Sequence, residues 1–150
     1  MKDEEESTKG SHLTGNFRVR AVRPALGAAR RLFPRAADRA EVRSQALKLR
    51  YWPAKNPSTQ SGQLLDLNWD WIKALKGLNV GELRIDDKIG GFDNLRVVFF
   101  VGDKKIHRPL PIIWVLHVMQ KKRMEFTAPD LAIFKARRTL VMNWFYKGRT

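Results

Sequence analysis

The spacing of apolar residues predicts different elements in two neighbouring stretches of the chain. Residues 47–52 (LKLRYW) alternate between apolar and polar side chains, which is typical of a half-buried strand. Residues 63–78 follow a loop with two prolines, and their apolar side chains recur every three or four positions. This second pattern predicts an amphipathic helix that ends at Gly77.

Three strands are predicted in the middle of the chain. Residues 81–86, 94–103 and 111–120 are rich in β-branched and aromatic side chains, and stretches containing glycine or proline separate them. Because the connections are short, we expect the three strands to form an antiparallel meander.

A last helix is predicted from a capping signal. Thr127 and Asp130 have the spacing of a capping box, and apolar residues then recur on one helical face at Ile133, Phe134, Val141 and Phe145. The order strand, helix, three strands, helix predicts an α+β fold, in which helices pack on one face of a small antiparallel meander sheet.

Residues 1–46 have a different composition from residues 47–150. Between Gly10 and Leu47 there are eight Arg and no Lys, and residues 25–33 and 36–47 are compatible with helices. We therefore expect an arginine-rich extension, partly disordered or marginally helical, followed by the main domain. An alternative is an RNA-binding arm, because arginine-rich segments often fold on RNA.

Charge and composition narrow the function. The 150 residues include 29 Lys and Arg against 15 Asp and Glu, a net charge of +14, which favours a polyanionic partner such as nucleic acid over a membrane surface. No Cys and only three His are present, so we expect no metal and no other cofactor. Without an apolar run of about 18 residues or a signal peptide, a cytoplasmic protein is expected.

Cations from separate strands are predicted to converge. Arg84 and Arg96 alternate with apolar neighbours, so both point away from the apolar face of the meander. The third strand runs directly into Lys121, Lys122 and Arg123. We therefore expect a basic surface on the face of the sheet that has no helices. The alternative is that Lys121, Lys122 and Arg123 form a solvated loop and that Arg84 and Arg96 are ordinary exposed strand residues.

Such a surface suits cleavage of RNA without a metal. The 2′-OH of RNA can attack the adjacent phosphate if its proton is accepted and the growing phosphoryl charge is stabilised. Arginine suits the second task, since its planar fork contacts two phosphate oxygens while it stays charged. A lysine can accept the proton only if neighbouring cations lower its pKa.

Further RNA contacts are assigned to Lys104, Lys105, His117 and Lys135. Each has a structural explanation too, because the first two lie at a turn, His117 alternates with apolar strand residues, and Lys135 falls on the exposed side of the last helix. The tryptophans at 69, 71, 114 and 144 are interpreted as core residues rather than as platforms for bases.

Residues 81–100 (GELRIDDKIGGFDNLRVVFF) and 111–138 (PIIWVLHVMQKKRMEFTAPDLAIFKARR) resemble the RelE/HigB-type toxins of bacterial type II toxin–antitoxin systems, particularly the phage-derived branch. The shared features are a Leu-Arg-Val strand followed by aromatic residues, a strand that ends in a Lys pair, and a helix that begins with a Thr-x-x-Asp turn. The resemblance covers about residues 47–146 and not residues 1–46.

The resemblance implies a toxin that cleaves mRNA on the ribosome and is inhibited by a cognate antitoxin protein. By position, Arg96 would contact the scissile phosphate, Arg84 would match the arginine of the preceding strand, and the cationic run would match Lys121, Lys122 and Arg123. Family members often carry a catalytic Tyr or His shortly after the last strand, where this chain has Met124-Glu125-Phe126. The general base is thus unassigned, and a non-catalytic binding module, such as a gyrase-directed toxin, is the alternative.

Overall fold

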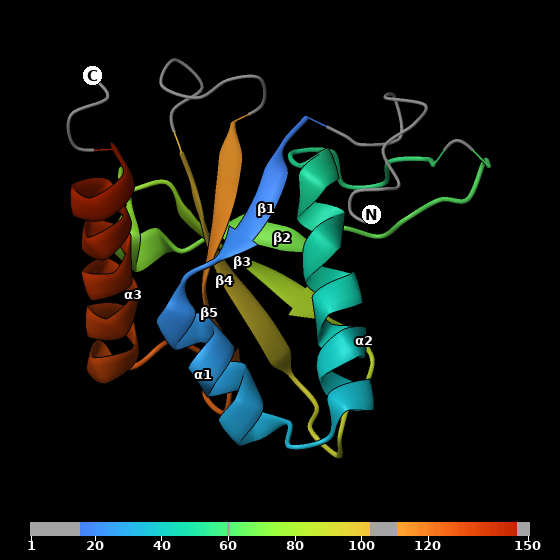
Figure 1. Ribbon diagram of the computed structural model, residues 1–150, viewed down its shortest axis with the longest axis horizontal. Coiled ribbons are helices and arrows are strands. Elements are labelled where there is room, and N and C mark those ends of the chain that lie inside the picture. The colour runs from blue at the N-terminus through green and yellow to red at the C-terminus, as the bar shows by residue number, and fades with distance from the viewer. Residues whose placement is uncertain (1–15, 60, 103–110, 147–150) are drawn as a thin grey trace.

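The computed structural model describes residues 16–59, 61–102 and 111–146, which form a five-stranded mixed sheet flanked by three α-helices (Figure 1). The sheet order is β1-β5-β4-β3-β2. The elements are β1 (Arg18–Ala21), α1 (Arg23–Leu32), α2 (Ala36–Leu47), the 3-10 turn η2 (Lys48–Tyr51), β2 (Trp69–Trp71), the 3-10 turn η3 (Lys73–Leu75), β3 (Val80–Ile85), β4 (Leu95–Val101), β5 (Ile112–Gln120), α3 (Ala128–Val141) and the π-helical turn η4 (Met142–Tyr146).

The predicted meander is confirmed by β3, β4 and β5. These strands pair antiparallel, with Arg84 opposite Arg96 and Arg96 opposite Met119. The predicted last helix is also confirmed, because Thr127 accepts from the backbone N–H of Asp130, whose carboxylate accepts from the N–H of Thr127. The α+β class therefore holds, but the sheet is mixed, since β1 runs parallel to β5.

The arginine-rich segment is part of the same fold. Its β1 is an edge strand of the sheet, its two predicted helices are present, and its apolar residues Phe17, Val22, Phe33 and Val42 are buried in the core. The expectation that residues 1–46 lie outside the main domain is wrong for residues 18–46, because these supply β1, α1 and all but the last residue of α2 to it. The acidic tip of the sequence lies outside the described residues.

Two predicted elements are wrong. Residues 47–52 are not a strand, because they form the end of α2 and the turn η2. Residues 63–78 are not a helix, since they contain an irregular segment, the short strand β2 and the turn η3. Pairing of β2 with β3 outweighs the helical spacing, and Leu64 of the expected apolar face is 69% exposed.

Helices cover both faces of the sheet, which corrects the expectation that they pack on one face (Figure 1). A groove between α1 and α2 has Val115 and Val118 of β5 in its lining. On the opposite face, the Arg138 guanidinium of α3 lies 4.9 Å from the ring centroid of Phe100, and the Trp114 indole donates to the Tyr146 hydroxyl (3.0 Å). The pairing of β4 with β5 shifts register between Val98 and Phe99, and this irregularity interrupts the alternation of β5 at Leu116. Val115 and Val118 therefore lie on one face of the sheet and Trp114 on the other.

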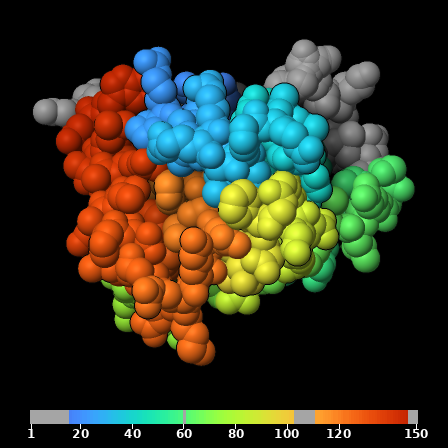
Figure 2. All heavy atoms as spheres, turned by 90° about the horizontal axis from the view of Figure 1, so that it is seen from below, coloured from blue at the N-terminus to red at the C-terminus, as the bar shows by residue number. Residues whose placement is uncertain are grey.

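The connection between β3 and β4 closes the lower side of the molecule. Figure 2 shows this segment, in yellow, beside the blue and cyan helices α1 and α2. The rings of Phe33 and Phe92 meet edge to face there, 5.8 Å apart. On the other face, α3 contacts Phe100, Leu116 and His117, and η4 contacts Trp114, whereas Glu82 and Arg84 line a pocket.

Candidate functional site

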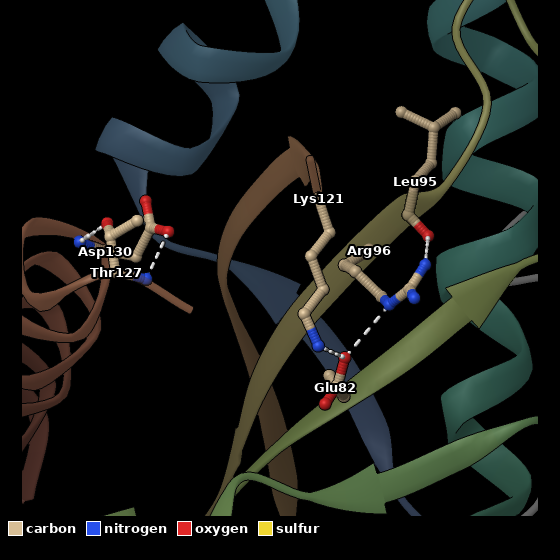
Figure 3. A network of polar contacts seen from close by, with 6 residues as sticks. All are labelled: Glu82, Leu95, Arg96, Lys121, Thr127 and Asp130. Atoms are coloured by element: carbon tan, nitrogen blue, oxygen red, sulfur yellow. Dashed lines mark hydrogen bonds and ion pairs between the residues drawn. The ribbon is translucent and has the colours of Figure 1, made fainter. Parts of the chain in front are cut away.

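A buried carboxylate joins two of the predicted cations. The Nε of Arg96 donates to Glu82 Oε1 at 3.0 Å, and the Nζ of Lys121 lies 3.7 Å from the same oxygen (Figure 3). The three side chains are only 10–12% exposed. Glu82 comes from β3, Arg96 from β4, and Lys121 is the first residue after β5, so the meander itself assembles this Glu82 cluster.

Backbone and ring contacts hold the two cations in place. Arg96 also donates through Nη1 to the Leu95 carbonyl at 3.2 Å. The ammonium of Lys121 lies 4.4 Å from the ring centroid of Phe126, and its backbone N–H donates to the Asn94 carbonyl. Both cations contact Oε1 of Glu82, so Oε2 is the oxygen that neither of them occupies.

A pocket of about 510 Å³ adjoins the cluster. Its charged lining has three cations and three carboxylates, with apolar side chains contributed by β2, η3 and the segment after β5. The charged residues are Lys73, Arg84, Lys121, Asp70, Glu82 and Glu125. The expected basic surface is therefore a pocket of mixed charge, which offers proton acceptors as well as phosphate-binding groups.

The other predicted site residues lie in different surroundings. Arg84 is exposed and lines the pocket, whereas Lys122 and Arg123 are exposed and line a smaller pocket of about 200 Å³ beside the start of α3. Lys135 is exposed on α3. Lys104 and Lys105 lie outside the described residues. Of the predicted cations, Arg84, Arg96 and Lys121 are thus the ones brought to the Glu82 cluster and its pocket.

His117 is directed to α3 instead. Its Nδ1 lies 2.8 Å from Nη1 of Arg137 and its ring packs against Phe134. Burial, together with the charges of Arg137 and Arg31, lowers the pKa of His117 from 6.5 to about 4, although Asp130 acts in the opposite direction. The imidazole is therefore neutral at pH 7 and adds no positive charge to the basic residues around it.

Glu82 is a site residue that the sequence prediction missed, although the sequence carries its signal. Glu82 and Arg84 are two positions apart on one strand, so the alternation that places Arg84 on this face also places Glu82 there. The interpretation as core is wrong for two tryptophans, because Trp71 is 42% and Trp144 is 66% exposed. Trp114 is buried as expected.

Within the described ranges, no group of three His, Asp or Glu residues is arranged to hold a metal ion. None of the helices in that part of the chain is long and apolar enough to cross a bilayer. No family model, curated protein or solved structure matches this chain. Fold and site together define an α+β protein with a five-stranded mixed sheet and a buried Glu-Arg-Lys cluster beside a charged pocket.

Proposed function

We propose that the protein is the toxin of a type II toxin–antitoxin pair and cleaves mRNA on the ribosome in the cytoplasm without a metal. The observation that carries the proposal is the meeting of Arg84, Arg96 and Lys121 around the Glu82 carboxylate and its pocket. These cations come from the strands whose sequence resembles RelE/HigB-type toxins. The net charge of +14 supports an RNA partner.

Glu82 takes the role of the general base that the resemblance left unassigned. Its Oε2 would accept the proton of the 2′-OH, while the 2′-oxygen attacks phosphorus and the bond to the 5′-oxygen breaks. Arg84, exposed at the pocket, would contact the phosphoryl oxygens as their charge grows. Lys121, whose ammonium lies beside Glu82, would return a proton to the leaving 5′-oxygen, and Arg96 would orient the carboxylate.

A binding module without catalysis is the second candidate. One observation favours it: Glu82 already pairs with Arg96 and Lys121, and the pocket has as many carboxylates as cations. In this alternative the Glu82 cluster stabilises the sheet, and exposed cations elsewhere bind RNA or a protein surface. Salt-sensitive binding without cleavage products is then expected.

The experiment that tests the proposal is sequencing of RNA 5′ ends in cells that briefly express the protein. Arg84→Ala is the most informative variant, because Arg84 is exposed and its loss leaves the buried pair of Glu82 and Arg96 intact. Arg43→Ala is its matched control, since it removes an exposed arginine from α2, on the other side of the sheet.

We expect cuts within translated frames from the parent protein and the Arg43→Ala control, with a loss of about tenfold or more in Arg84→Ala. Glu82→Gln should abolish cutting, because the amide cannot accept the proton. Full cutting by Glu82→Gln would refute its role as the base. The absence of new ends despite folded parent protein would refute the nuclease and favour the binding module.

A further inference from the structure

Trp71 is an exposed aromatic side chain at the end of the edge strand β2. It is 42% exposed, whereas the core tryptophan Trp114 is 2% exposed. The indole is held edge to face by two neighbours, with ring centroids 5.2 Å from Trp69 and 5.6 Å from Trp52. Phe17 packs in turn against Trp52 at 5.5 Å. These ring contacts restrict the side chain of Trp71, which would therefore lose little conformational freedom on binding a ligand.

Two pockets meet at this tryptophan. One is the pocket beside the Glu82 cluster, and the other has a volume of about 610 Å³ and lies along β2, η3 and the start of β3. Trp71, Ile72 and Lys73 line both of them, so the pockets adjoin at the edge of the sheet.

The second pocket differs from the first in its charge. Lys73 and Lys76 contribute to its lining, and none of the described residues that line it carries a carboxylate. Leu75 and Val80 are buried beneath it, and Asn79 adds an exposed amide. An exposed indole beside two lysines combines a stacking surface with phosphate contacts, which is how proteins bind single-stranded nucleic acid.

We propose that this second pocket binds a nucleotide of single-stranded RNA adjacent to the one held at the Glu82 cluster. Trp71 stacks on the base, Lys76 contacts one phosphate, and Lys73, which lines both pockets, contacts the phosphate between the two nucleotides. The strand must be single, because bases in a duplex are stacked on one another and cannot cover the indole. The inference rests on the proposed function in taking RNA as the ligand and the pocket beside the Glu82 cluster as the neighbouring nucleotide site.

The test is fluorescence anisotropy with a labelled single-stranded 2′-O-methyl RNA, which lacks the attacking hydroxyl and so reports binding without cleavage. Trp71→Ala is compared with Trp71→Phe, which keeps an aromatic ring. The matched control is Trp144→Ala, because Trp144 is 66% exposed in η4 and lines neither pocket. Circular dichroism of each variant verifies that the fold is retained.

We expect Trp71→Ala to raise the Kd about tenfold, Trp71→Phe to raise it about threefold or less, and Trp144→Ala to leave it within about twofold. Trp71→Ala should not change the slope of log K against log salt, since no cation is lost. Lys73→Ala and Lys76→Ala should each make this salt dependence shallower, which means that the magnitude of the slope falls by about 0.7. These salt slopes separate stacking from charge.

Equal affinities of Trp71→Ala and Trp144→Ala would overturn the proposal and leave Trp71 as a contact for a protein partner. Duplex RNA that competes as well as the single strand would overturn it as well. The proposed nuclease is tested separately by the RNA ends. If Trp71→Ala weakens binding while the parent cuts nothing, the inference stands and the nuclease fails. If the parent cuts RNA while Trp71→Ala binds as tightly as the parent, the nuclease stands and the inference fails.

Discussion

Removal of the Glu82 carboxylate is expected to destabilise the protein strongly. Breaking a fully buried ion pair costs about 3–5 kcal/mol, whereas an exposed pair contributes about 0–1 kcal/mol. The Glu82 cluster is close to the buried limit, since its side chains are 10–12% exposed. Glu82→Ala leaves Arg96 and Lys121 near each other without their acceptor.

Two contacts reduce that cost. Arg96 keeps its hydrogen bond to the Leu95 carbonyl, and the ammonium of Lys121 keeps its contact with the ring of Phe126. We therefore expect Glu82→Ala to lower the free energy of unfolding by about 2–3 kcal/mol. For a chain of 150 residues, this loss corresponds to a fall in Tm of roughly 5–10 °C.

Urea unfolding followed by circular dichroism measures this loss. Glu125→Ala is the control, because Glu125 lines the same pocket but is exposed, and it should change stability by less than about 0.5 kcal/mol. The double variant Glu82→Met/Arg96→Met should be more stable than the sum of the single changes predicts, by about 1 kcal/mol or more. If Glu82→Ala costs no more than Glu125→Ala, the cluster is solvated and the reasoning is refuted.

Three further predictions concern the framework of the site. Thr127→Ala removes the capping side chain of α3 and should cost about 1 kcal/mol in urea unfolding, and Thr127→Ser should retain most of it. Gly81→Ala places a Cβ 2.6 Å from the ring of Phe99, so a loss of about 1–3 kcal/mol is expected, and an unchanged urea midpoint would contradict this packing. The folded state binds a proton on His117 less readily than the unfolded chain, since its pKa is about 4 instead of 6.5. Stability should therefore fall as pH drops from about 6.5 towards 4, and His117→Gln should flatten the fall in Tm between pH 7 and 5.

The meander and the last helix were predictable because their signals are local. Strands β4 and β5 are rich in β-branched and aromatic residues, β3 alternates Leu83 and Ile85 with Glu82 and Arg84, and the start of α3 is marked by its own capping box. The role of residues 18–47 was not predictable in the same way. Strand β1 has only four residues, and its parallel pairing with β5 joins positions more than ninety residues apart.

The failed helix over residues 63–78 has a related cause. Leu67 and Leu75 are both buried, but Leu67 lies in an irregular segment that is held by non-local contacts, and Leu75 lies in the 3-10 turn η3. The N–H of Leu67 donates to the carbonyl of Lys55, and Trp69 donates through its indole to the carbonyl of Pro53. Apolar spacing reports which side chains are buried, and it cannot report that their partners come from another loop.

The cations of the candidate site were predictable from the sequence, but the ion pairs that Arg96 and Lys121 form with Glu82 were not. Arg84 and Arg96 follow from strand alternation, and the same rule identifies Glu82 as a carboxylate on the same face, two positions from Arg84. Lys121 could not be paired with Glu82 from the sequence, because that contact depends on β5 lying beside β4 and on the direction in which the chain leaves β5.

Charge is unevenly distributed over the described fold. The pocket beside Glu82 has three cations and three carboxylates, so it contributes little net attraction for a polyanion. The segment from β1 to α2 has eight arginines against Asp38 and Glu41, and most of these arginines are exposed. Under the proposed function, long-range attraction of RNA would therefore be shared among these eight arginines, so the loss of one of them, as in Arg43→Ala, would change it little, whereas the pocket would position one phosphate. If the proposed RNA partner is right, a chain that relied on the pocket alone would bind it weakly, and the charge of +14 would supply the attraction that the nearly neutral pocket lacks.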